Sequence, residues 1–320
     1  MEMVLLFFNK IKGLKNFFGP IRADLRRKPM KKIFISLILI LAWMSTGSAT
    51  TLKEIKESGV LRHLGVYYAN FNTGAGDGYD TEIMQLFAKH LGVRYQHVET
   101  TFATVITDLS GIKVKARGSE VDILGITKPK GDIIANGLTI LPWRQKVVNY
   151  STPTFPTQVW LLARSDSPMN PVHPTGNPED DITAVKAMLK NKTVLEKKNT
   201  CLDADLYQLS DVGAILKSFS GGLADMAPAI IQGEAECTIL DVPDALVALE
   251  KWGDKVKVIG PVSKFQGMGA GFTKDASVLR KTFNDFLIKI KNDGTLYKLV
   301  NKYYPLAFQF YPNFFSDLKQ

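Results

Sequence analysis

The chain has 320 residues, of which 45% are hydrophobic and 22% charged, and this composition is typical of a globular protein with a large core. Its formal net charge is +9, but residues 1–49 hold nine basic and two acidic side chains. The rest of the chain then has 31 basic and 29 acidic residues, a net charge of +2. Such a balance gives no support for binding to a polyanion, and no nucleic-acid partner is predicted.

The basic N-terminal segment has the pattern of an export signal. Met30-Lys31-Lys32 precedes an apolar run from Ile33 to Met44, and small residues follow at 47–49. The run has about 12 residues, fewer than the roughly 20 that cross a bilayer, although a membrane anchor is the alternative. No cysteine follows the run, so a lipid anchor is not expected. We therefore predict an N-terminal extension and signal peptide over residues 1–49 and a periplasmic mature protein.

Apolar spacing along the rest of the chain alternates between helical and strand periods. Helices are expected over 52–58, 80–91, 102–109, 182–189, 223–232, 276–291 and 296–303. Strands are expected over 60–66, 93–98, 132–135, 158–163, 193–196, 237–240 and 256–259. Asp80 is expected to cap the second helix. This βαβ rhythm predicts parallel sheets covered by helices.

Residues 112–129 interrupt that rhythm. Two alternating runs flank Gly118-Ser119, which predicts a hairpin with opposite charges across its strands. We interpret it as a solvated flap without a binding role.

The two cysteines are not expected to form a disulfide. Cys201 follows the strand at 193–196, whereas Cys237 begins the strand at 237–240. If these strands are parallel, the thiols lie at opposite edges, more than ~13 Å apart, whereas a disulfide needs Cα atoms within about 7 Å. Cys201 is expected to face the cleft near a helix N-terminus, where a thiol is more reactive.

No motif of a cofactor or metal site is present. The four histidines have no metal-ligand spacing, and the sequence lacks a phosphate-binding Gly loop, a Gly-x-Ser-x-Gly elbow and a CxxC pair. No metal and no cofactor are predicted, and the chain is not expected to be an enzyme.

Three polar segments follow buried strands, at 137–144, 197–201 and 241–244. Ligands of open α/β sheets bind beyond the carboxyl ends of strands. A guanidinium binds a carboxylate through two hydrogen bonds, hydroxyls and helix N-termini add donors, and a carboxylate accepts from an ammonium. The three segments together therefore predict a site for a zwitterion.

These segments carry a family resemblance. Over about residues 52–305 the chain resembles the bacterial extracellular solute-binding proteins of family 3, the polar amino-acid receptors of ABC transporters. The matching stretches are LKEIKESGVLR (52–62), GYDTEIMQLFAKHLGV (78–93), GLTILPWRQKVVNYS (137–151), VPDAL (242–246) and LIKIKNDGTLYKLVNKYYP (287–305).

The resemblance implies roles for individual residues. In the family a Gly-x-Thr-x-x-x-x-Arg loop holds the ligand carboxylate, and Gly137, Thr139 and Arg144 match it. The second-lobe Gly-Thr-Thr loop matches Asn199-Thr200-Cys201, and the Asp that binds the α-ammonium matches Asp241. The ligand-binding residues predicted in this way and from the polar segments are Gly137, Thr139, Arg144, Thr200, Asp241, Phe102, Tyr68 and Lys197.

Each assignment has a structural alternative. Arg144 is equally typical of a surface ion pair, and Thr139 of a strand end. Asp241 and Thr200 also fit helix caps, and aromatic residues such as Phe102 and Tyr68 are often core. The chain also departs from the family pattern, because Tyr67-Tyr68 replaces a frequent acid and Asn199, Cys201 and the 112–129 insert are unusual.

The resemblance also implies the fold: an α/β, two-lobed periplasmic-binding-protein type II fold, or Venus flytrap, with two hinge crossings. Lobe 1 would comprise 50–154 and 269–320, lobe 2 158–263, and the hinge 155–157 and 264–268.

The implied function is that of a monomeric substrate-binding protein. It would capture an amino acid or related small carboxylate by lobe closure and deliver it to an inner-membrane ABC permease. One alternative is a dehydratase-like enzyme of the same fold, with Glu196 or Asp203 as its acid. The other is a ligand-presenting sensory partner.

We predict that the exported protein begins near Thr50, because small residues suited to cleavage follow the short apolar run. N-terminal sequencing of protein recovered from the periplasm checks this. Recovery of chains that retain residues 30–49 would show that the segment is not removed.

Overall fold

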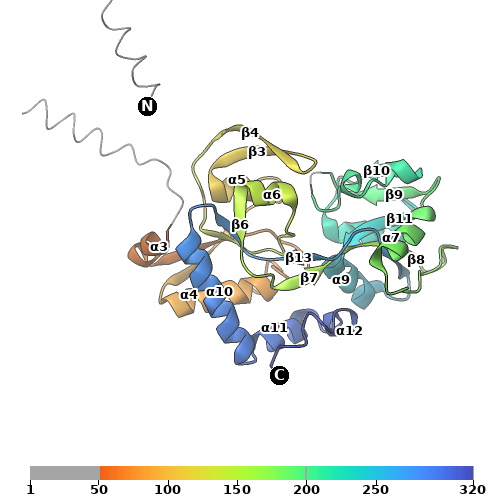
Figure 1. Cartoon of the computed structure of the whole chain (residues 1–320). Helices are drawn as coiled ribbons and strands as arrows, with labels where there is room; N and C mark the ends of the chain where they lie inside the picture. The colour runs from red at the N-terminus through yellow and green to blue at the C-terminus, as the bar shows by residue number, and fades with distance from the viewer. Residues whose placement is uncertain (1–50, 199, 320) are drawn as a thin grey trace, which may run out of the picture. The chain divides into compact units, whose positions relative to one another are not determined.

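Two five-stranded sheets organise the computed structural model of the protein, which describes residues 51–198 and 200–319 (Figure 1). The predicted signal peptide at 1–49 and Asn199 lie outside the described residues. No helix among the described residues has the length and apolar character needed to cross a membrane.

The first sheet has the strand order β2-β1-β5-β14-β6. Its strands are β1 (Val60–Gly65), β2 (Arg94–Glu99), β5 (Ile133–Ile134), β6 (Val148–Tyr150) and β14 (Gly271–Thr273). Because side chains alternate along a strand, Leu61 and Ile133 belong to one apolar cluster and Leu64 and Ile134 to another. Both faces of this sheet are therefore buried.

Helices cover these faces, and their ends follow local sequence signals. Thr51 and Glu54 form a capping box at the first helix, and Gly59 and Gly92 close two helices in the left-handed conformation. The helices are α3 (Leu52–Ser58), α4 (Tyr79–Leu91), α5 (Val105–Ser110), α6 (Pro142–Val147), α10 (Ser277–Asn292), α11 (Thr295–Tyr303) and α12 (Ala307–Phe310).

The second sheet has the order β10-β9-β11-β8-β12. Its strands are β8 (Val159–Arg164), β9 (Thr193–Glu196), β10 (Ile215–Ser218), β11 (Cys237–Asp241) and β12 (Val256–Pro261). The accompanying helices are α7 (Pro178–Ala187), α8 (Met226–Ile231), α9 (Val242–Trp252) and the 3₁₀ turns η2 (Ala204–Tyr207), η3 (Ser210–Val212) and η4 (Leu223–Asp225).

A short antiparallel ribbon of two strands lies, in chain order, where the chain passes from one sheet to the other. It pairs β7 (Phe155–Thr157) with β13 (Gln266–Met268). The two predicted crossings, at 155–157 and 264–268, coincide with these strands. The lobe boundaries themselves stay a prediction.

The predicted parallel order is confirmed for β1, β2 and β5 and for β9 and β11, but each sheet as a whole is mixed. β14 runs antiparallel to β5 and β6, and β8 runs antiparallel to β11 and β12. Each of these strands comes directly after a strand of the β7–β13 ribbon. No crossover helix precedes it, so the rule that makes βαβ units parallel does not set its direction.

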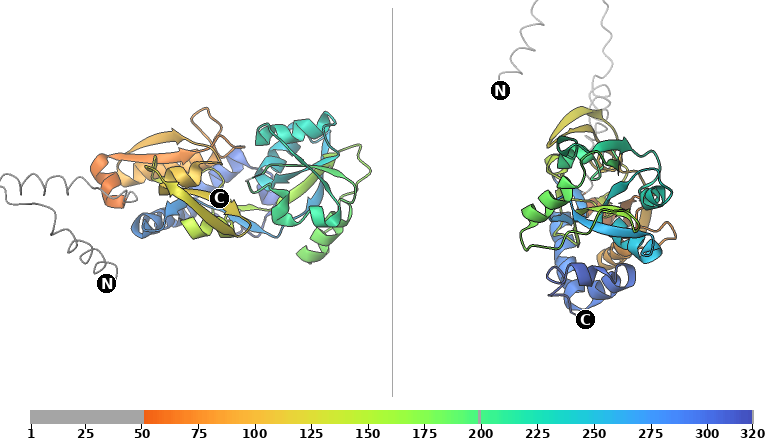
Figure 2. Two further views of the ribbon diagram at one scale, coloured as in Figure 1. Left: turned by 90° about the horizontal axis from the view of Figure 1, so that it is seen from above. Right: turned by 90° about the vertical axis from the view of Figure 1, so that its right-hand side faces the viewer.

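The hairpin predicted at 112–129 is confirmed as β3 (Ile112–Arg117) and β4 (Glu120–Ile126), a two-stranded sheet that packs on α5 and α6 (Figure 2). Lys115 pairs with Asp122 across the strands, and Arg117 Nε lies 3.5 Å from the Asp122 carboxylate.

The parallel pairing expected around the cysteines is confirmed. β9 and β11 are parallel, Cys237 pairs with Val194, and both thiols are free. We therefore expect two thiols to titrate per denatured, unreduced monomer. An intramolecular bridge found by mass spectrometry would contradict this strand placement.

Candidate functional site

Arg144 is a buried arginine in the first turn of α6. Pro142 starts this helix, and the Arg144 side chain is 2% exposed. Its Nη1 donates to the Thr139 carbonyl at 2.9 Å, and the Tyr150 hydroxyl donates to the same oxygen at 3.2 Å. The Arg144 Nε and the Thr139 hydroxyl have no hydrogen-bond partner among the described residues. Arg144 is thus no surface base, and its Nε and the Thr139 hydroxyl are available to a ligand.

Asp241 is a second buried charge, at the junction of β11 and α9. It is the N-cap residue of α9, but its side chain makes no capping hydrogen bond. Instead Oδ2 accepts from the Tyr68 hydroxyl at 3.3 Å and the Cys201 thiol at 2.7 Å, and Oδ1 is unpaired among the described residues. Burial raises the pKa of Asp241 to about 6, and the hydrogen bonds from Cys201 and Tyr68 counteract this. The capping alternative therefore does not account for this carboxylate.

Cys201 lies between these two charges and was not among the predicted ligand-binding residues. Burial, and then the Asp241 carboxylate, raise the pKa of its thiol well above the ordinary value, while Arg144 opposes that effect. The expectation of a more reactive thiol was wrong, because Cys201 is buried and donates its proton to Asp241.

Asp244 is a further acid that the sequence reasoning missed. It follows Asp241 by one turn of α9, is 6% exposed, and its Oδ2 has no partner among the described residues. Burial, and then the Asp241 charge, raise the pKa of Asp244 to about 8, and a hydrogen bond with Tyr68 lowers it. The i, i+3 spacing of the two acids was the available signal, because it puts both on one face of the helix.

Four of the predicted residues line a cavity of about 640 Å³, namely Tyr68, Phe102, Lys197 and Thr200. The rings of Tyr68 and Phe102 meet edge to face, with centroids 5.3 Å apart. Tyr68 also bonds Asp241, and Thr200 precedes Cys201, so the cavity adjoins the buried charges. The sequence-predicted residues Thr139, Arg144 and Asp241 lie in that buried cluster and do not line the cavity.

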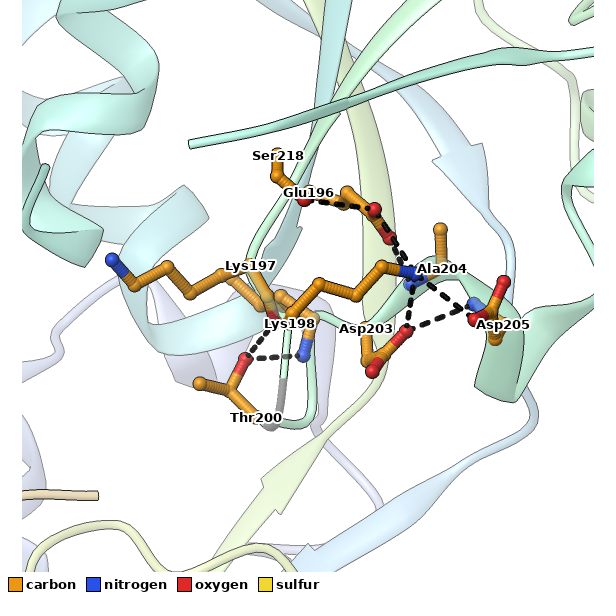
Figure 3. A network of polar contacts seen from close by, with 9 residues as sticks. Glu196, Lys197, Lys198, Thr200, Asp203, Ala204, Asp205 and Ser218 are labelled. Carbon is orange, nitrogen blue, oxygen red and sulfur yellow. Dashed lines mark hydrogen bonds and ion pairs between the residues drawn. The ribbon is translucent and has the colours of Figure 1, made fainter. Parts of the chain in front are cut away.

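The loop after β9 is held by its two lysines, and Figure 3 shows the contacts of Lys198. Lys197 Nζ donates to three carbonyls of the segment before η4, those of Phe219, Ser220 and Gly221. Lys198 Nζ lies 3.0–3.1 Å from carboxylates of Glu196, Asp203 and Asp205. Thr200 is not the cap of η2, which is Asp203; its hydroxyl closes a turn by donating to the Lys197 carbonyl and accepting from Leu202 N–H.

Gly137 does not line the cavity, but it lies against the rings of Phe71 and Tyr68. Its φ is +64°, and a Cβ there would meet the Phe71 ring at 2.6 Å, so only glycine fits. Its N–H donates to Asp80 Oδ2 at 2.7 Å. The prediction that Asp80 caps α4 was wrong, because Gly78 is the N-cap and Asp80 orients the turn at Gly137.

The tip of the β3–β4 hairpin lines a second cavity of about 480 Å³. Gly118 and Ser119 face Asp205 and Tyr207 across it, and Thr200 lines both cavities. The hairpin therefore borders the site region and is not only a solvated flap. Among the described residues, no group of three or more His, Cys, Asp or Glu side chains is arranged to hold a metal.

Comparison with known proteins gives related chains of two kinds. Residues 66–305 match the family model described as bacterial extracellular solute-binding proteins, family 3. The chain is 27% identical over 290 residues to membrane-bound lytic murein transglycosylase F of Pseudomonas putida (strain GB-1), covering 88% of this chain but 53% of that protein. It thus spans about half the length of that relative. It is 23% identical over 284 residues to the L-cystine-binding protein TcyJ of Escherichia coli (strain K12), covering 87% and 95%.

Solved structures confirm the predicted two-lobed periplasmic-binding-protein type II fold. The holo form of ArgBP from T. maritima matches with a TM-score of 0.57 and 25% identity, covering 75% of this chain and 94% of that one. The ancestral amino acid-binding protein AncCDT-1, a precursor of cyclohexadienyl dehydratase, matches with a TM-score of 0.63 and 24% identity, covering 80% and 100%.

The raised pKa of Asp244 predicts how stability depends on pH. Because the folded carboxyl keeps its proton up to about pH 8 and the unfolded one only to about 3.8, this stabilisation is complete below about pH 3.8. It is lost as the pH rises through about 8. We expect the free energy of unfolding to fall between about pH 4 and 8, and Asp244→Asn to flatten that slope by roughly 1 kcal/mol per pH unit.

Urea unfolding at several pH values measures the slope, with the exposed Asp166→Asn as the control. Asp80 and Asp241, whose pKa values burial raises to about 7 and about 6, keep part of the slope in both variants. An Asp244→Asn protein with the wild-type slope would show that Asp244 is ionised at neutral pH.

Proposed function

Because the chain belongs to the bacterial extracellular solute-binding proteins of family 3, we propose that it is a periplasmic protein that captures an amino acid or related small carboxylate by lobe closure. We further propose that it works as a monomer and delivers the ligand to the permease of an ABC transporter. The observation that carries the proposal is the buried pair of Arg144 and Asp241, each with an unpaired polar atom among the described residues.

In the proposed complex these two side chains bind the head group of the ligand. The Arg144 guanidinium and the Thr139 hydroxyl bind the carboxylate, because a guanidinium forms two parallel charge-assisted hydrogen bonds with it. Asp241 accepts from the α-ammonium in place of the Tyr68 hydroxyl. The charges of the ligand then lie beside protein charges of opposite sign where solvent is largely excluded. Each electrostatic interaction is therefore stronger than it would be in water.

We expect the ligand to favour lobe closure, because the proposed binding residues come from segments attached to different sheets. Thr139, Arg144 and Tyr68 belong to segments attached to the first sheet, and Asp241 and Thr200 to segments attached to the second. A ligand that contacts both sets stabilises the closed arrangement by differential affinity. The β7–β13 ribbon between the sheets is our proposed hinge.

The dehydratase alternative requires a free acid, and Glu196 and Asp203 were the candidates. Both already pair with Lys198, and Glu196 Oε2 also accepts from Ala204 N–H at 2.9 Å (Figure 3). A general acid must have its proton available to a substrate, so these contacts support a binding role over catalysis. Because some relatives are enzymes, the matching control is to test whether the purified protein turns over a prephenate-like acid.

We expect Arg144→Ala to weaken amino-acid binding by about 2–5 kcal/mol, or roughly 30-fold to several thousand-fold, because the carboxylate loses its buried partner. Calorimetry with the ligand found in a thermal-shift screen measures this, with circular dichroism to verify folding. Arg164→Ala, at a partly exposed arginine paired with Asp166, is the control.

The variant Asp241→Asn tests recognition of the ammonium end of the ligand independently of its carboxylate end. It should weaken binding of α-amino acids more than binding of carboxylates that lack an ammonium. Unchanged affinity in Arg144→Ala, or equal losses for both ligand classes in Asp241→Asn, would overturn the assignment.

A further inference from the structure

The walls of the 640 Å³ cavity contain charge only on two lysines. Among the described lining residues none is Asp or Glu, and Lys197 and Lys198 are the charged ones. The cavity adjoins the head-group residues through Tyr68 and Thr200, so it is the space into which a ligand side chain would extend. What the two ammonium groups can still bind therefore decides which side chains fit.

Lys197 has no donor left for a ligand. An ammonium carries three N–H groups, and its Nζ lies 3.2, 3.3 and 2.6 Å from the carbonyl oxygens of Phe219, Ser220 and Gly221. These contacts tie the end of β9 to the segment before η4. A ligand carboxylate would have to break that tie to reach the lysine.

Lys198 is occupied as well, by three acids. Its Nζ lies 3.0 Å from Glu196, 3.1 Å from Asp203 and 3.0 Å from Asp205 (Figure 3). Three carboxylates around one ammonium already exceed its charge. An acidic ligand side chain would be repelled by them. None of the three acids lines the cavity, so none is placed to pair with a cationic side chain there.

The remaining walls suit an uncharged group. They combine the aromatic and aliphatic surface of Tyr67, Tyr68, Phe102, Val66 and Leu223 with the neutral polar side chains of Asn72, Thr73, Thr100, Thr101 and Thr200. A charge buried against such walls without a partner costs more than it gains, whereas apolar or amide groups are accommodated.

We infer that the ligand is an amino acid with an uncharged side chain, and that the cavity discriminates against acidic and basic side chains alike. This inference rests on the proposed function, because it places the head group at Arg144 and Asp241. It makes Lys197 and Lys198 loop-positioning residues that do not contact the ligand.

Calorimetry at neutral pH with purified ligand-free protein tests the selectivity. The panel pairs glutamine with glutamate, which have the same shape, and adds methionine, phenylalanine, lysine and arginine. We expect the best uncharged amino acid to bind at least about tenfold more tightly than glutamate, lysine or arginine. A charged amino acid that binds as tightly as the best uncharged one overturns the inference but leaves the proposed function intact. Binding of none of the six, in calorimetry and thermal shift, overturns both.

A gain of function tests where the side chain lies. Thr101 lines the cavity and is exposed, three residues before Thr104, the N-cap of α5, so an acid at this position stays in contact with solvent. We expect Thr101→Asp to bind arginine or lysine at least about tenfold more tightly than the wild type, and the neutral Thr101→Asn to keep the wild-type preference. Unchanged selectivity in a folded Thr101→Asp protein would place the ligand side chain outside this cavity and overturn the inference.

Discussion

The hydrogen bonds to the Asp241 carboxylate join the two halves of the candidate site. Tyr68 reaches this carboxylate from the segment after β1, and Cys201 from the loop after β9. A buried carboxylate is costly unless donors surround it, and here only one of its oxygens is satisfied. This desolvation cost raises the pKa of Asp241 and of its neighbour Asp244. A site built in this way gains most when an ammonium arrives.

The C-terminal segment packs beside β7, one strand of the ribbon that we propose as the hinge. Trp160 in β8 packs on Phe310 and Tyr311, with ring centroids 5.1 and 6.3 Å away, and the Tyr311 hydroxyl donates to Gln158. The Phe155 ring of β7 packs on Tyr304, 4.7 Å away. These aromatic contacts bury apolar surface beside the crossing at 155–157, so a hinge movement there would have to keep them or exchange them.

The relatives of this chain include binding proteins and enzymes, and the fold alone does not separate them. We propose that the binding role is favoured by the arrangement of the acids. Glu196 and Asp203 are committed to Lys198, which orders the loop that carries Thr200 and Cys201. The buried charges are opposite in sign and lie in segments of different sheets, an arrangement suited to holding a zwitterion.

Local signals in the sequence determined most of the helices and the hairpin. The apolar spacing of α4 and α10, the glycines after α3 and α4, and the alternation around Gly118-Ser119 depend on nearby residues alone. The candidate head-group residues Gly137, Thr139, Arg144 and Asp241 were identified through the resemblance to the family. Tertiary structure decided the rest, because it depends on contacts between distant segments. The direction of β8 and β14 follows from the two crossings, and Asp80 bonds Gly137 across 57 residues of chain. The burial of Cys201 against Asp241 and the raised pKa of Asp244 beside Tyr68 arise only when distant segments meet, and no local pattern encodes which partners they find.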